Sequence, residues 1–293
     1  MNDPRPLLAV DAPSMLFRAF YALPDSIKGP DGKPVNALLG TTNLILREVE
    51  RFEPRAVALC FGPDAADYRV ELYSGYHAER PEVPDDLAPQ FADSDDFFSA
   101  FGWTVTHHPS LEADDVLGSY AKLEEKAGGR TLLLTGDRDL YQCASDRTTV
   151  LYVRTGSRGA EEVTPEEVRS RYGIAPELVP DFIALRGDPS DGLPGAKGVG
   201  EKTAATLLRE HGSLEAVLEH AIREPRPALR SSLLDGRDDL LAYKDIATLR
   251  DAGVKRPRDR RTDWAGAGEA ARERGMNRLA KRLAGLGERP RGR

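Results

Sequence analysis

Residues 187–204 read GDPSDGLPGAKGVGEKTA and combine two chemical features in eighteen residues. Asp188 and Asp191 are two carboxylates three residues apart, a spacing that lets both face one metal site. The glycines that follow predict a tight turn, and Lys202 and Thr203 then open a helix. Because the N-terminus of a helix presents unpaired N–H groups and a positive dipole end, this turn favours a bound phosphate. Together, the two features indicate an enzyme that cuts a nucleic-acid backbone.

Length and composition indicate a globular protein of one large or two modest domains. The chain has 293 residues, of which 40% are hydrophobic and 30% are charged, as in ordinary soluble proteins. No window approaches the roughly 18 unbroken apolar residues that span a bilayer, and the polar N-terminus lacks the apolar core of a secretory signal. Two cysteines and five histidines without close ligand spacing argue against a disulfide framework and structural zinc. These observations predict a cytoplasmic protein.

The net charge of −7 at first argues against a nucleic-acid partner, but its distribution does not. Residues 254–293 contain thirteen Lys or Arg and five Asp or Glu, a net charge of +8, which leaves −15 for the rest of the chain. A basic end on an acidic body suits phosphate contact in one region and cation binding in another. The simpler alternative is that the last dozen residues are only a solvated tail, and 287–293 are assigned as a basic tail.

Short apolar runs alternate with segments of helical period in the first half of the chain. The runs that read as buried strands are 7–10, 56–61, 103–106, 132–135 and 150–153, and the helical segments are 38–51, 93–101 and 114–126. This alternation predicts an α/β fold with a parallel sheet. Thr164 is a predicted N-cap with Glu167 three residues later, and helical segments continue to about Leu286. We therefore expect an α/β domain at 1–163 and an all-helical domain at 164–286.

Carboxylates gather where the predicted strands end. The eight that stand out are Asp11, Glu112, Asp114, Asp115, Asp137, Asp139, Asp188 and Asp191. The carboxyl ends of parallel strands share one edge of a sheet, so these side chains are expected to converge. Oxygen-only ligands select hard cations such as Mg²⁺ or Mn²⁺, and two such ions would activate a water and stabilise the leaving oxygen of a phosphodiester. The alternative is that each Asp only caps a helix or a turn.

Several motifs resemble the 5′-nuclease family, which includes the N-terminal domain of bacterial DNA polymerase I, phage 5′-exonucleases and flap endonucleases. The matching segments are 10–12, 17–20, 61–80, 111–118, 135–140 and 188–204, within a resemblance that extends from about residue 6 to about residue 250. The resemblance implies a PIN-like parallel-sheet nuclease domain with a helical arch around 69–100. It implies a following helical DNA-binding domain of the helix–three-turn–helix (helix–hairpin–helix) type. Without a polymerase domain, the chain resembles a stand-alone bacterial flap endonuclease.

The resemblance also implies roles for individual residues. The eight carboxylates would bind two or more Mg²⁺ or Mn²⁺ ions, directly or through water. Arg80 and His77 would act at the scissile phosphate, and Tyr76 would stack on an unpaired base. The implied DNA contacts are Arg18, Arg69, Tyr76, Lys197, Gly198, Gly200, Lys202 and Thr203, with a K⁺ ion held at the glycine turn. The implied substrate is DNA with a 5′ flap or a 5′ end, or an RNA-primer hybrid, cut by a monomeric enzyme to leave a 5′-phosphate.

Two departures from the family pattern bear on catalysis. The family has Phe-Asp-Ala after the second strand, whereas this chain has Phe61-Gly62-Pro63-Asp64. Asp64 or water is therefore expected to fill the ligand position, with altered metal preference or weaker occupancy. The family has Tyr-Lys in the arch, whereas this chain has Tyr76-His77. A protonated His77 is expected to replace the lysine as a phosphate ligand, although histidine is mostly neutral at pH 7.

Three functional classes follow from these observations. The leading one is a structure-specific, metal-dependent 5′ nuclease of DNA replication and repair, which contacts phosphates rather than reading bases. The second is a catalytically weakened paralogue that binds flap or junction DNA without efficient cleavage. The third is a metal-dependent ribonuclease of a related α/β type, which would lack the helical C-terminal domain.

Overall fold

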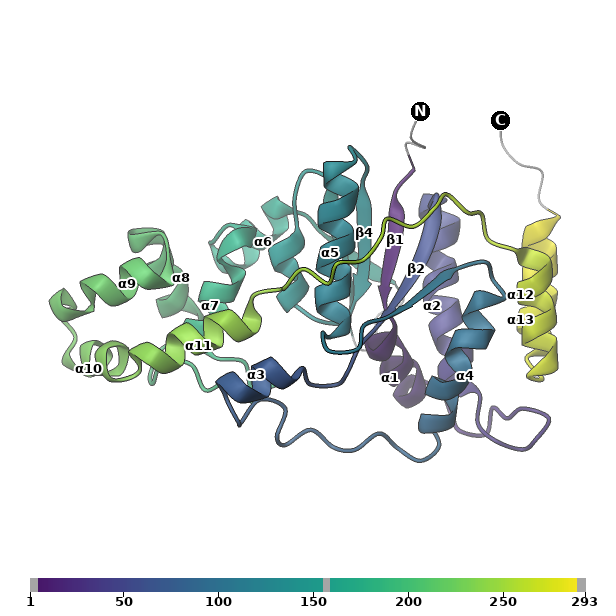
Figure 1. Ribbon diagram of the computed structural model, residues 1–293, viewed down its shortest axis with the longest axis horizontal. Helices are drawn as coiled ribbons and strands as arrows, with labels where there is room; N and C mark the ends of the chain where they lie inside the picture. Colours follow the sequence, from purple (N-terminus) through teal and green to yellow (C-terminus); the bar gives the residue numbers. More distant parts are fainter. Residues whose placement is uncertain (1–4, 155–158, 289–293) are drawn as a thin grey trace.

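The computed structural model describes residues 5–154 and 159–288, which are built around a six-stranded sheet (Figure 1). The strands are β1 (Leu7–Asp11), β2 (Ala56–Phe61), β3 (Thr104–His107), β4 (Thr131–Thr135), β5 (Thr148–Val153) and β6 (Ala160–Val163). They lie in the order β3-β2-β1-β4-β5-β6, in which β1 to β5 are parallel and β6 is antiparallel to β5. Every residue of β1, β2 and β4 is buried, which is typical of parallel strands covered on both faces. The predicted parallel sheet is confirmed, and β6 adds an antiparallel edge to it.

Helices cover both faces of this sheet. One face packs against α1 (Ala12–Ala22), α2 (Asn36–Phe52) and α4 (Ala88–Ser99), and the other packs against α5 (Ala113–Lys126). Successive side chains of β1 point to opposite faces, so Leu8 and Val10 join the first core and Leu7 and Ala9 the second. In the described ranges, no helix combines the length and the apolar character that a membrane crossing needs.

The strand order places the carboxyl ends of β1 and β4 side by side. Asp11 is the last residue of β1, and Thr135 is the last residue of β4, followed directly by Gly136 and Asp137. The strand order reverses direction between these two strands, which is where open α/β sheets bind ligands. The helix α5 follows β3 and begins after Glu112, its N-cap. The fold therefore brings the acidic motifs of three separate segments to one edge.

A helical domain extends from one side of the sheet (Figure 1). It contains α6 (Pro165–Tyr172), α7 (Val179–Arg186), α8 (Glu201–His211), α9 (Leu214–His220), α10 (Pro227–Asp235) and α11 (Arg237–Ala247). Thr164 caps α6 as predicted, since its side chain accepts a hydrogen bond from the N–H of Glu167 at 3.4 Å. The apolar core of this domain is continuous with the core on the α5 face of the sheet. The two parts therefore share one core.

The end of the chain leaves the helical domain. Residues 249–263, here called the strap, contain no helix or strand and return along the α/β domain (Figure 1). They lead to α12 (Trp264–Glu273) and α13 (Asn277–Gly287), here called the C-terminal hairpin. The hairpin packs into the same core as α2 and α4, through residues that include Ala267, Ala271, Leu279 and Leu283. The last two helices within the predicted helical domain of 164–286 thus pack on the α/β domain. The predicted basic tail of 287–293 lies, beyond Glu288, outside the described residues.

The segment expected to form a helical arch is helical only at its two ends. The short helix α3 (Asp67–Leu72) and the helix α4 flank residues 73–87, which form turns and extended chain. Pro81 and Pro84 lie in this segment, and proline lacks the N–H group that a helix interior needs. We call residues 73–87 the arch segment, and the helices of the predicted arch flank it on both sides.

Candidate active site

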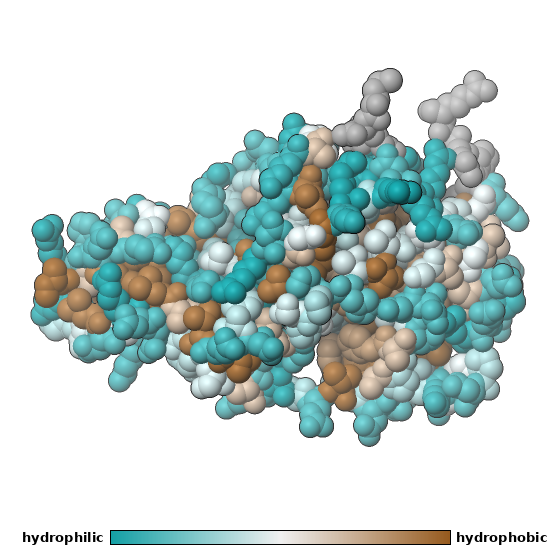
Figure 2. All heavy atoms as spheres, viewed as in Figure 1, coloured by the Kyte–Doolittle hydropathy of each residue, from teal (hydrophilic) through white to brown (hydrophobic). Residues whose placement is uncertain are grey.

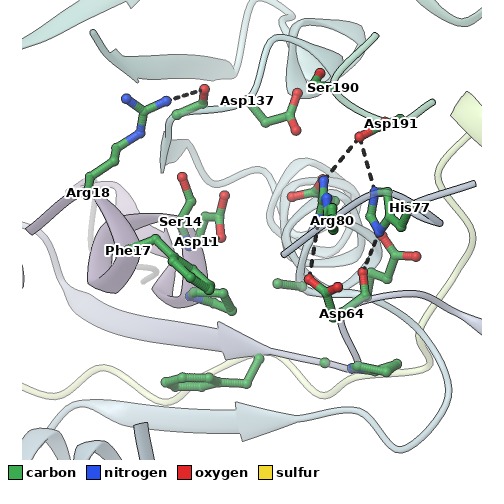
Figure 3. Close-up of a pocket in the computed structure, with 18 of the residues that line it drawn as sticks. Asp11, Ser14, Phe17, Arg18, Asp64, His77, Arg80, Asp137, Ser190 and Asp191 are labelled. Carbon is green, nitrogen blue, oxygen red and sulfur yellow. Dashed lines mark hydrogen bonds and ion pairs between the residues drawn. The ribbon is translucent and has the colours of Figure 1, made fainter. Parts of the chain in front are cut away.

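A cavity of about 1190 Å³ lies at the carboxyl edge of the sheet, between the arch segment and the loop that follows α7. Six of the eight predicted carboxylates line it, namely Asp11, Glu112, Asp114, Asp137, Asp188 and Asp191. They come from four separate segments of the chain. Figure 3 shows Asp11, Asp137 and Asp191 around this cavity, with Arg80 and His77 reaching Asp191 from the arch segment. The structure thus places most of the predicted acidic residues together.

Burial and mutual repulsion perturb the carboxylates at the base of the cavity. Burial, reinforced by the charges of Asp11 and Asp137, raises the pKa of Asp114 well above its usual range. Burial also raises the pKa of Asp137 to about 7, and the charge of Asp191 adds to this effect. Burial raises the pKa of Asp11 as well, although Thr135 Oγ1 donates a hydrogen bond to it at 2.8 Å. Carboxylates that oppose one another's ionisation form a favourable place for a cation.

Asp139 and Asp188 extend this acidic group in two directions. Asp139 is buried behind the cavity wall, where its N–H donates to Asp137 at 2.9 Å. Burial and the charge of Asp137 raise the pKa of the Asp139 carboxyl well above its usual range. Asp188 accepts hydrogen bonds at 2.9 Å from Arg186 and from the N–H of Ser190. Asp188 is therefore already partnered, whereas Asp139 is a further carboxyl whose ionisation its surroundings oppose.

The arch segment is held to Asp191 by its two candidate catalytic side chains. His77 Nε2 and Arg80 Nη2 each lie 3.1 Å from Asp191 Oδ1 (Figure 3). Burial alone would raise the pKa of Asp191, but the hydrogen bond from His77 and the charge of Arg80 bring it below its usual value. Arg80 is 36% exposed and lines the cavity, so it can turn towards a bound phosphate.

His77 does not have the free imidazole that a phosphate ligand needs. Its side chain is only 4% exposed, and Nδ1 lies 2.7 Å from the carbonyl oxygen of Asp64. The ring stacks on Tyr76 with a centroid distance of 3.9 Å. The backbone φ of His77 is +54°, a left-handed value that a non-glycine residue adopts only when its surroundings enforce it. In this structure His77 positions Asp191 and the arch segment. Its imidazole is not presented to a phosphate, as the predicted contact requires.

Glu112 is held by a buried network that also engages two predicted DNA contacts. Glu112 Oε2 lies 2.6 Å from Arg69 Nη1 and accepts a hydrogen bond from the Tyr76 hydroxyl at 3.0 Å. Its other oxygen accepts the N–H of Ala66 at 2.8 Å. Arg69 is 3% exposed and does not line the cavity, so the structure does not present it to a phosphate. Tyr76 is 5% exposed but lines the cavity, and its stacking on a base stays a prediction.

Asp115 faces away from the cavity, although its neighbour Asp114 lines it. The side chain of Asp115 is fully buried, and Oδ1 accepts hydrogen bonds from Arg69 at 3.2 Å and from the N–H of Arg250 at 2.7 Å. Asp115 Oδ2 accepts the N–H of Glu112 at 3.2 Å and so closes a capping box at the start of α5. Consecutive residues point about 100° apart on a helix. Asp115 is thus an ion-pair partner of Arg69 that does not line the cavity, so the structure does not support its predicted role as a direct metal ligand.

Gly62 leaves no room for the aspartate that the family has at this position. A Cβ atom on Gly62 would lie 2.2 Å from the carbonyl oxygen of Leu111 and 2.8 Å from Cα of Glu112. Asp64 does not replace the missing ligand either, because its exposed carboxylate accepts a hydrogen bond from Arg80 at 3.1 Å. The expectation that Asp64 turns towards the metal site is not met. Water is the remaining candidate for that position.

Arg18 and the residues around it complete one wall of the cavity. Arg18 Nη2 donates to the carbonyl oxygen of Gly136 at 2.7 Å, which holds it beside the acidic group. Sequence reasoning missed Thr135, whose hydroxyl orients Asp11 and accepts the N–H of Asp137 at 2.9 Å. It also missed the apolar wall formed by Phe17, Phe61, Val83 and Phe91. The position of Thr135 directly before the Gly-Asp pair is a signal that could have found it.

The glycine turn lies outside this cavity, at the start of α8. Ala196 and Val199 are buried and anchor the turn, whereas Lys197, Gly198, Gly200 and Lys202 are exposed. Gly198 has a φ of +79° with open space around it, and Gly200 is the N-cap of α8 without a capping side chain. Thr203 is partly exposed in the first turn of this helix. The predicted phosphate-binding turn therefore presents its basic side chains and the end of a helix to solvent.

The oxygen-rich donor set of the cavity suits a hard divalent cation, although the side chains do not form a closed cage. Within residues 5–154 and 159–288, no three His, Cys, Asp or Glu side chains are arranged to hold one ion. The charges of Asp11, Asp114 and Asp137 nevertheless act on one another strongly. A divalent cation would relieve this repulsion, and Mg²⁺ keeps several waters in its coordination shell rather than demanding an all-protein cage. The residues present therefore fit such an ion.

The chain matches two family models over most of its length. The "5′-3′ exonuclease, N-terminal resolvase-like domain" covers residues 6–173, and the "5′-3′ exonuclease, C-terminal SAM fold" covers residues 174–259. The strap beyond residue 259 and the C-terminal hairpin lie outside both matches. A relative named 5′-3′ exonuclease from Mycobacterium tuberculosis is 40% identical over 236 residues, which are 74% of this chain and 74% of that protein.

Other relatives are much longer than this chain. DNA polymerase I of Mycobacterium tuberculosis is 42% identical over 231 residues, which are 78% of this chain and 26% of the polymerase. The thermostable DNA polymerase I of Thermus aquaticus is 39% identical over 244 residues, 83% of this chain and 28% of the polymerase. The chain thus spans about a quarter of the length of these polymerases.

Solved structures share the fold at low sequence identity. The D15 protein of phage T5, co-crystallised with metal ions, has a TM-score of 0.68 at 17% identity, with 97% of this chain and all of that chain covered. The catalytic core of Rad2 in complex with a DNA substrate has a TM-score of 0.64 at 15% identity, with 96% and 91% covered. These likenesses confirm the predicted fold class, and the family matches confirm the predicted family. The chain belongs to the 5′-3′ exonuclease family.

Proposed function

We propose that this chain is a divalent-metal-dependent 5′ nuclease that cuts DNA bearing a 5′ flap or a 5′ end. The observation that carries the proposal is the cavity in which carboxylates from separate segments raise one another's pKa. The relative named 5′-3′ exonuclease, three quarters of which this chain covers, supports the direction of cleavage. The two DNA-bound structures that share the fold, of a phage T5 flap endonuclease and of Rad2, support DNA with a junction as the substrate.

The acidic residues of the cavity would hold the cations. Asp11, Asp114, Asp137 and Asp139 form the inner group, with Glu112, Asp188 and Asp191 around them. When bound, two divalent ions lower the pKa of a water molecule and stabilise the leaving oxygen of the phosphodiester. Glu112 and Asp188 are kept in place by Arg69 and Arg186. The cations proposed are Mg²⁺ or Mn²⁺.

The basic residues would orient the nucleic acid. Arg80 would leave Asp191 for the scissile phosphate, since its guanidinium is partly exposed at the cavity. Arg18 would contact the strand that is cut. Lys197, Lys202 and the backbone N–H groups of the glycine turn would hold a phosphate of the duplex at the start of α8. These contacts are to phosphates, so cleavage should depend on substrate shape rather than sequence.

Carbonyl oxygens of the glycine turn would hold a K⁺ ion beside the duplex. RNA-primed DNA would be cut as well as DNA flaps, and the protein would act as a monomer in the cytoplasm. The product would carry a 5′-phosphate.

Cleavage of an end-labelled 5′-flap DNA tests the proposal. We expect cleavage near the junction with Mg²⁺ or Mn²⁺, none with a chelator, and a loss of at least a hundredfold in Asp137→Asn. Gly285→Ala, at an open position of α13, is the matched control and should cleave normally. Tight flap binding without metal-dependent cleavage would instead favour the weakened paralogue, which the departures at Gly62 and His77 bring into consideration. Cleavage of the RNA analogue alone would favour a ribonuclease.

A further inference from the structure

The strap carries a row of exposed cations. Its side chains Lys255, Arg258, Arg260 and Arg261 are all exposed, and none of them forms an ion pair with a carboxylate of the described ranges. The strap has three acidic residues: Asp259 pairs with Arg55, Asp263 caps α12, and Asp251, near the start of the strap, accepts the N–H of Gly253 at 2.9 Å. Figure 2 shows strongly hydrophilic residues where the strap crosses the molecule. The strap is therefore a locally uncompensated positive surface on a chain whose net charge is −7.

The strap is also held rigidly, although it contains no helix or strand. At its start, the N–H of Ala252 donates to Ser119 Oγ at 2.8 Å. In its middle, Arg256 donates to Glu124 at 3.1 Å, and the carbonyl oxygen of Pro257 accepts a hydrogen bond from the fully buried Arg55 at 2.9 Å.

Further contacts fix the second half of the strap. The N–H of Arg260 donates to the carbonyl oxygen of Arg55 at 2.9 Å, and the N–H of Asp263 donates to that of Phe101 at 2.8 Å. Fifteen residues without regular structure are costly to order and are uncommon in compact domains unless they have a function. Cations on a fixed backbone lose little further entropy when they bind a polyanion.

The cationic middle of the strap, residues 255–261, lies at the opposite end of the sheet from the cavity. Arg55, which anchors the strap, directly precedes β2, whereas the cavity lies at the carboxyl ends of the strands. The six residues of β2 separate the two regions by roughly 20 Å, at about 3.3 Å per residue. Only a nucleic acid that extends well beyond the cleavage site can reach both regions.

We propose that the strap is a second binding surface for the phosphate backbone of the substrate, engaged by DNA arms that extend past the active site. This inference rests on the proposed function, because it takes the same DNA as its ligand. Its partner is a polyanion rather than an apolar surface, since the exposed side chains of the strap's middle are almost all cationic. Such contacts release counterions, so binding weakens as salt is added. The slope of the logarithm of the binding constant against the logarithm of the salt concentration is about −0.9 for each duplex phosphate contacted.

Binding measured in Ca²⁺ or in chelator, without cleavage, tests the inference. The strap variant is K255E/R258E/R260E/R261E, and the matched control is R272E/R278E/K281E, which reverses three exposed cations of the C-terminal hairpin. Flap substrates would carry arms of about 5 or about 20 base pairs, or flaps of matching lengths, since 20 Å corresponds to about 6 base pairs.

We expect the strap variant to bind the long substrate at least about tenfold more weakly than the parent, with a salt slope smaller by up to about 3.6, or about 0.9 for each of the four cations. The short substrate should bind equally, and the hairpin control should bind both as the parent does. If the strap variant binds more weakly only when one particular arm is long, that arm is the DNA segment that the strap contacts. K255Q/R258Q/R260Q/R261Q, checked by thermal melting, provides the same test if charge reversal impairs folding.

Two results would overturn the inference. One is equal binding of the long substrate by parent and strap variant. The other is an equal loss in the hairpin control or on the short substrate, which would indicate only a general effect of net charge. If the parent binds no flap DNA at all, the proposed function is contradicted as well. That result differs from a failure of the strap inference alone, in which the parent still binds.

Discussion

At the scale of single residues, Asp115 is the clearest case of a carboxylate that acts through its neighbours. It is fully buried and pairs with Arg69, which in turn holds Glu112. Asp115→Asn keeps the shape of the side chain but leaves Arg69 with one carboxylate fewer. Removal of one partner from a buried pair costs about 3–5 kcal/mol. We therefore expect a lower free energy of unfolding, measured by urea denaturation, with a divalent-cation affinity close to that of the parent.

The matched comparison for Asp115 is Asp114, its neighbour on the same helix. Asp114→Asn removes a charge that Asp11 and Asp137 oppose, so the metal-free protein should become no less stable. Its calorimetric affinity for Mn²⁺ should fall sharply. If Asp115→Asn abolishes Mn²⁺ binding at unchanged stability, Asp115 is a ligand after all.

The inner carboxylates also predict how stability depends on pH and metal. The pKa of Asp137 is raised from 3.8 to about 7 in the folded protein. Between these values the folded state keeps a proton that the unfolded chain has lost, so the metal-free protein should lose stability as pH rises from about 4 to 7. A divalent cation binds the ionised form. Mg²⁺ should therefore raise the melting temperature more at about pH 8 than at about pH 5.5.

Asp137→Asn serves as the control for this effect. It should weaken both the pH dependence of the metal-free melting temperature and the rise caused by Mg²⁺. A rise of the same size at both pH values in the parent would contradict the coupling between ionisation and metal binding.

At the scale of elements, the close contact between the end of β2 and the start of α5 makes Gly62 a packing position. A Cβ at Gly62 meets backbone atoms of Leu111 and Glu112, which cannot rotate away. Gly62→Ala should therefore destabilise the protein by about 1–3 kcal/mol, as overpacking does, and should displace Glu112. Gly62→Asp should be at least as harmful rather than restore a ligand. Thermal denaturation beside Gly285→Ala, where a Cβ meets open space, provides the comparison.

The sequence predicts well those elements whose buried residues form a local hydrophobic pattern. The parallel strands are short apolar runs, and both ends of β1, β2 and β4 lie within one residue of the expected ranges. The arch segment and the strap have no such pattern, because their conformation depends on contacts far along the chain. Arg55 shows the difference, since a lone arginine gives no signal of being buried against residues 257–260.

The sequence likewise predicts only part of the active site. Convergence of the carboxylates follows from the shared carboxyl edge of a parallel sheet, which the alternating pattern predicts. Which of two adjacent carboxylates faces the cavity does not follow, since Asp114 and Asp115 differ only in their angle around α5. The burial of Arg69 and Tyr76 likewise depends on how α3 and the arch segment pack against Glu112.

At the scale of the whole molecule, the C-terminal hairpin closes the core on one face of the sheet. Leu283 is fully buried there, in one core with Leu8 of β1 and Leu46 of α2. Leu283→Ala should cost about 2–5 kcal/mol of unfolding free energy. Leu234→Ala, at a residue that is 40% exposed in α10, is the matched control and should cost less than about 1 kcal/mol.

The two tryptophans make it possible to tell whether the hairpin unfolds alone or with the rest. Trp103 precedes β3 and donates a hydrogen bond to Thr262 of the strap at 3.0 Å, and Trp264 opens α12. Their fluorescence therefore reports the hairpin side of the sheet, whereas circular dichroism reports every helix. Because both faces of the sheet share the same strands, the two signals should move to lower denaturant concentration together in Leu283→Ala. The fluorescence transition could instead shift while the main circular dichroism transition stays in place. The strap and hairpin would then be a separately folding layer, and the rigid cationic surface of the strap would be lost before the active site.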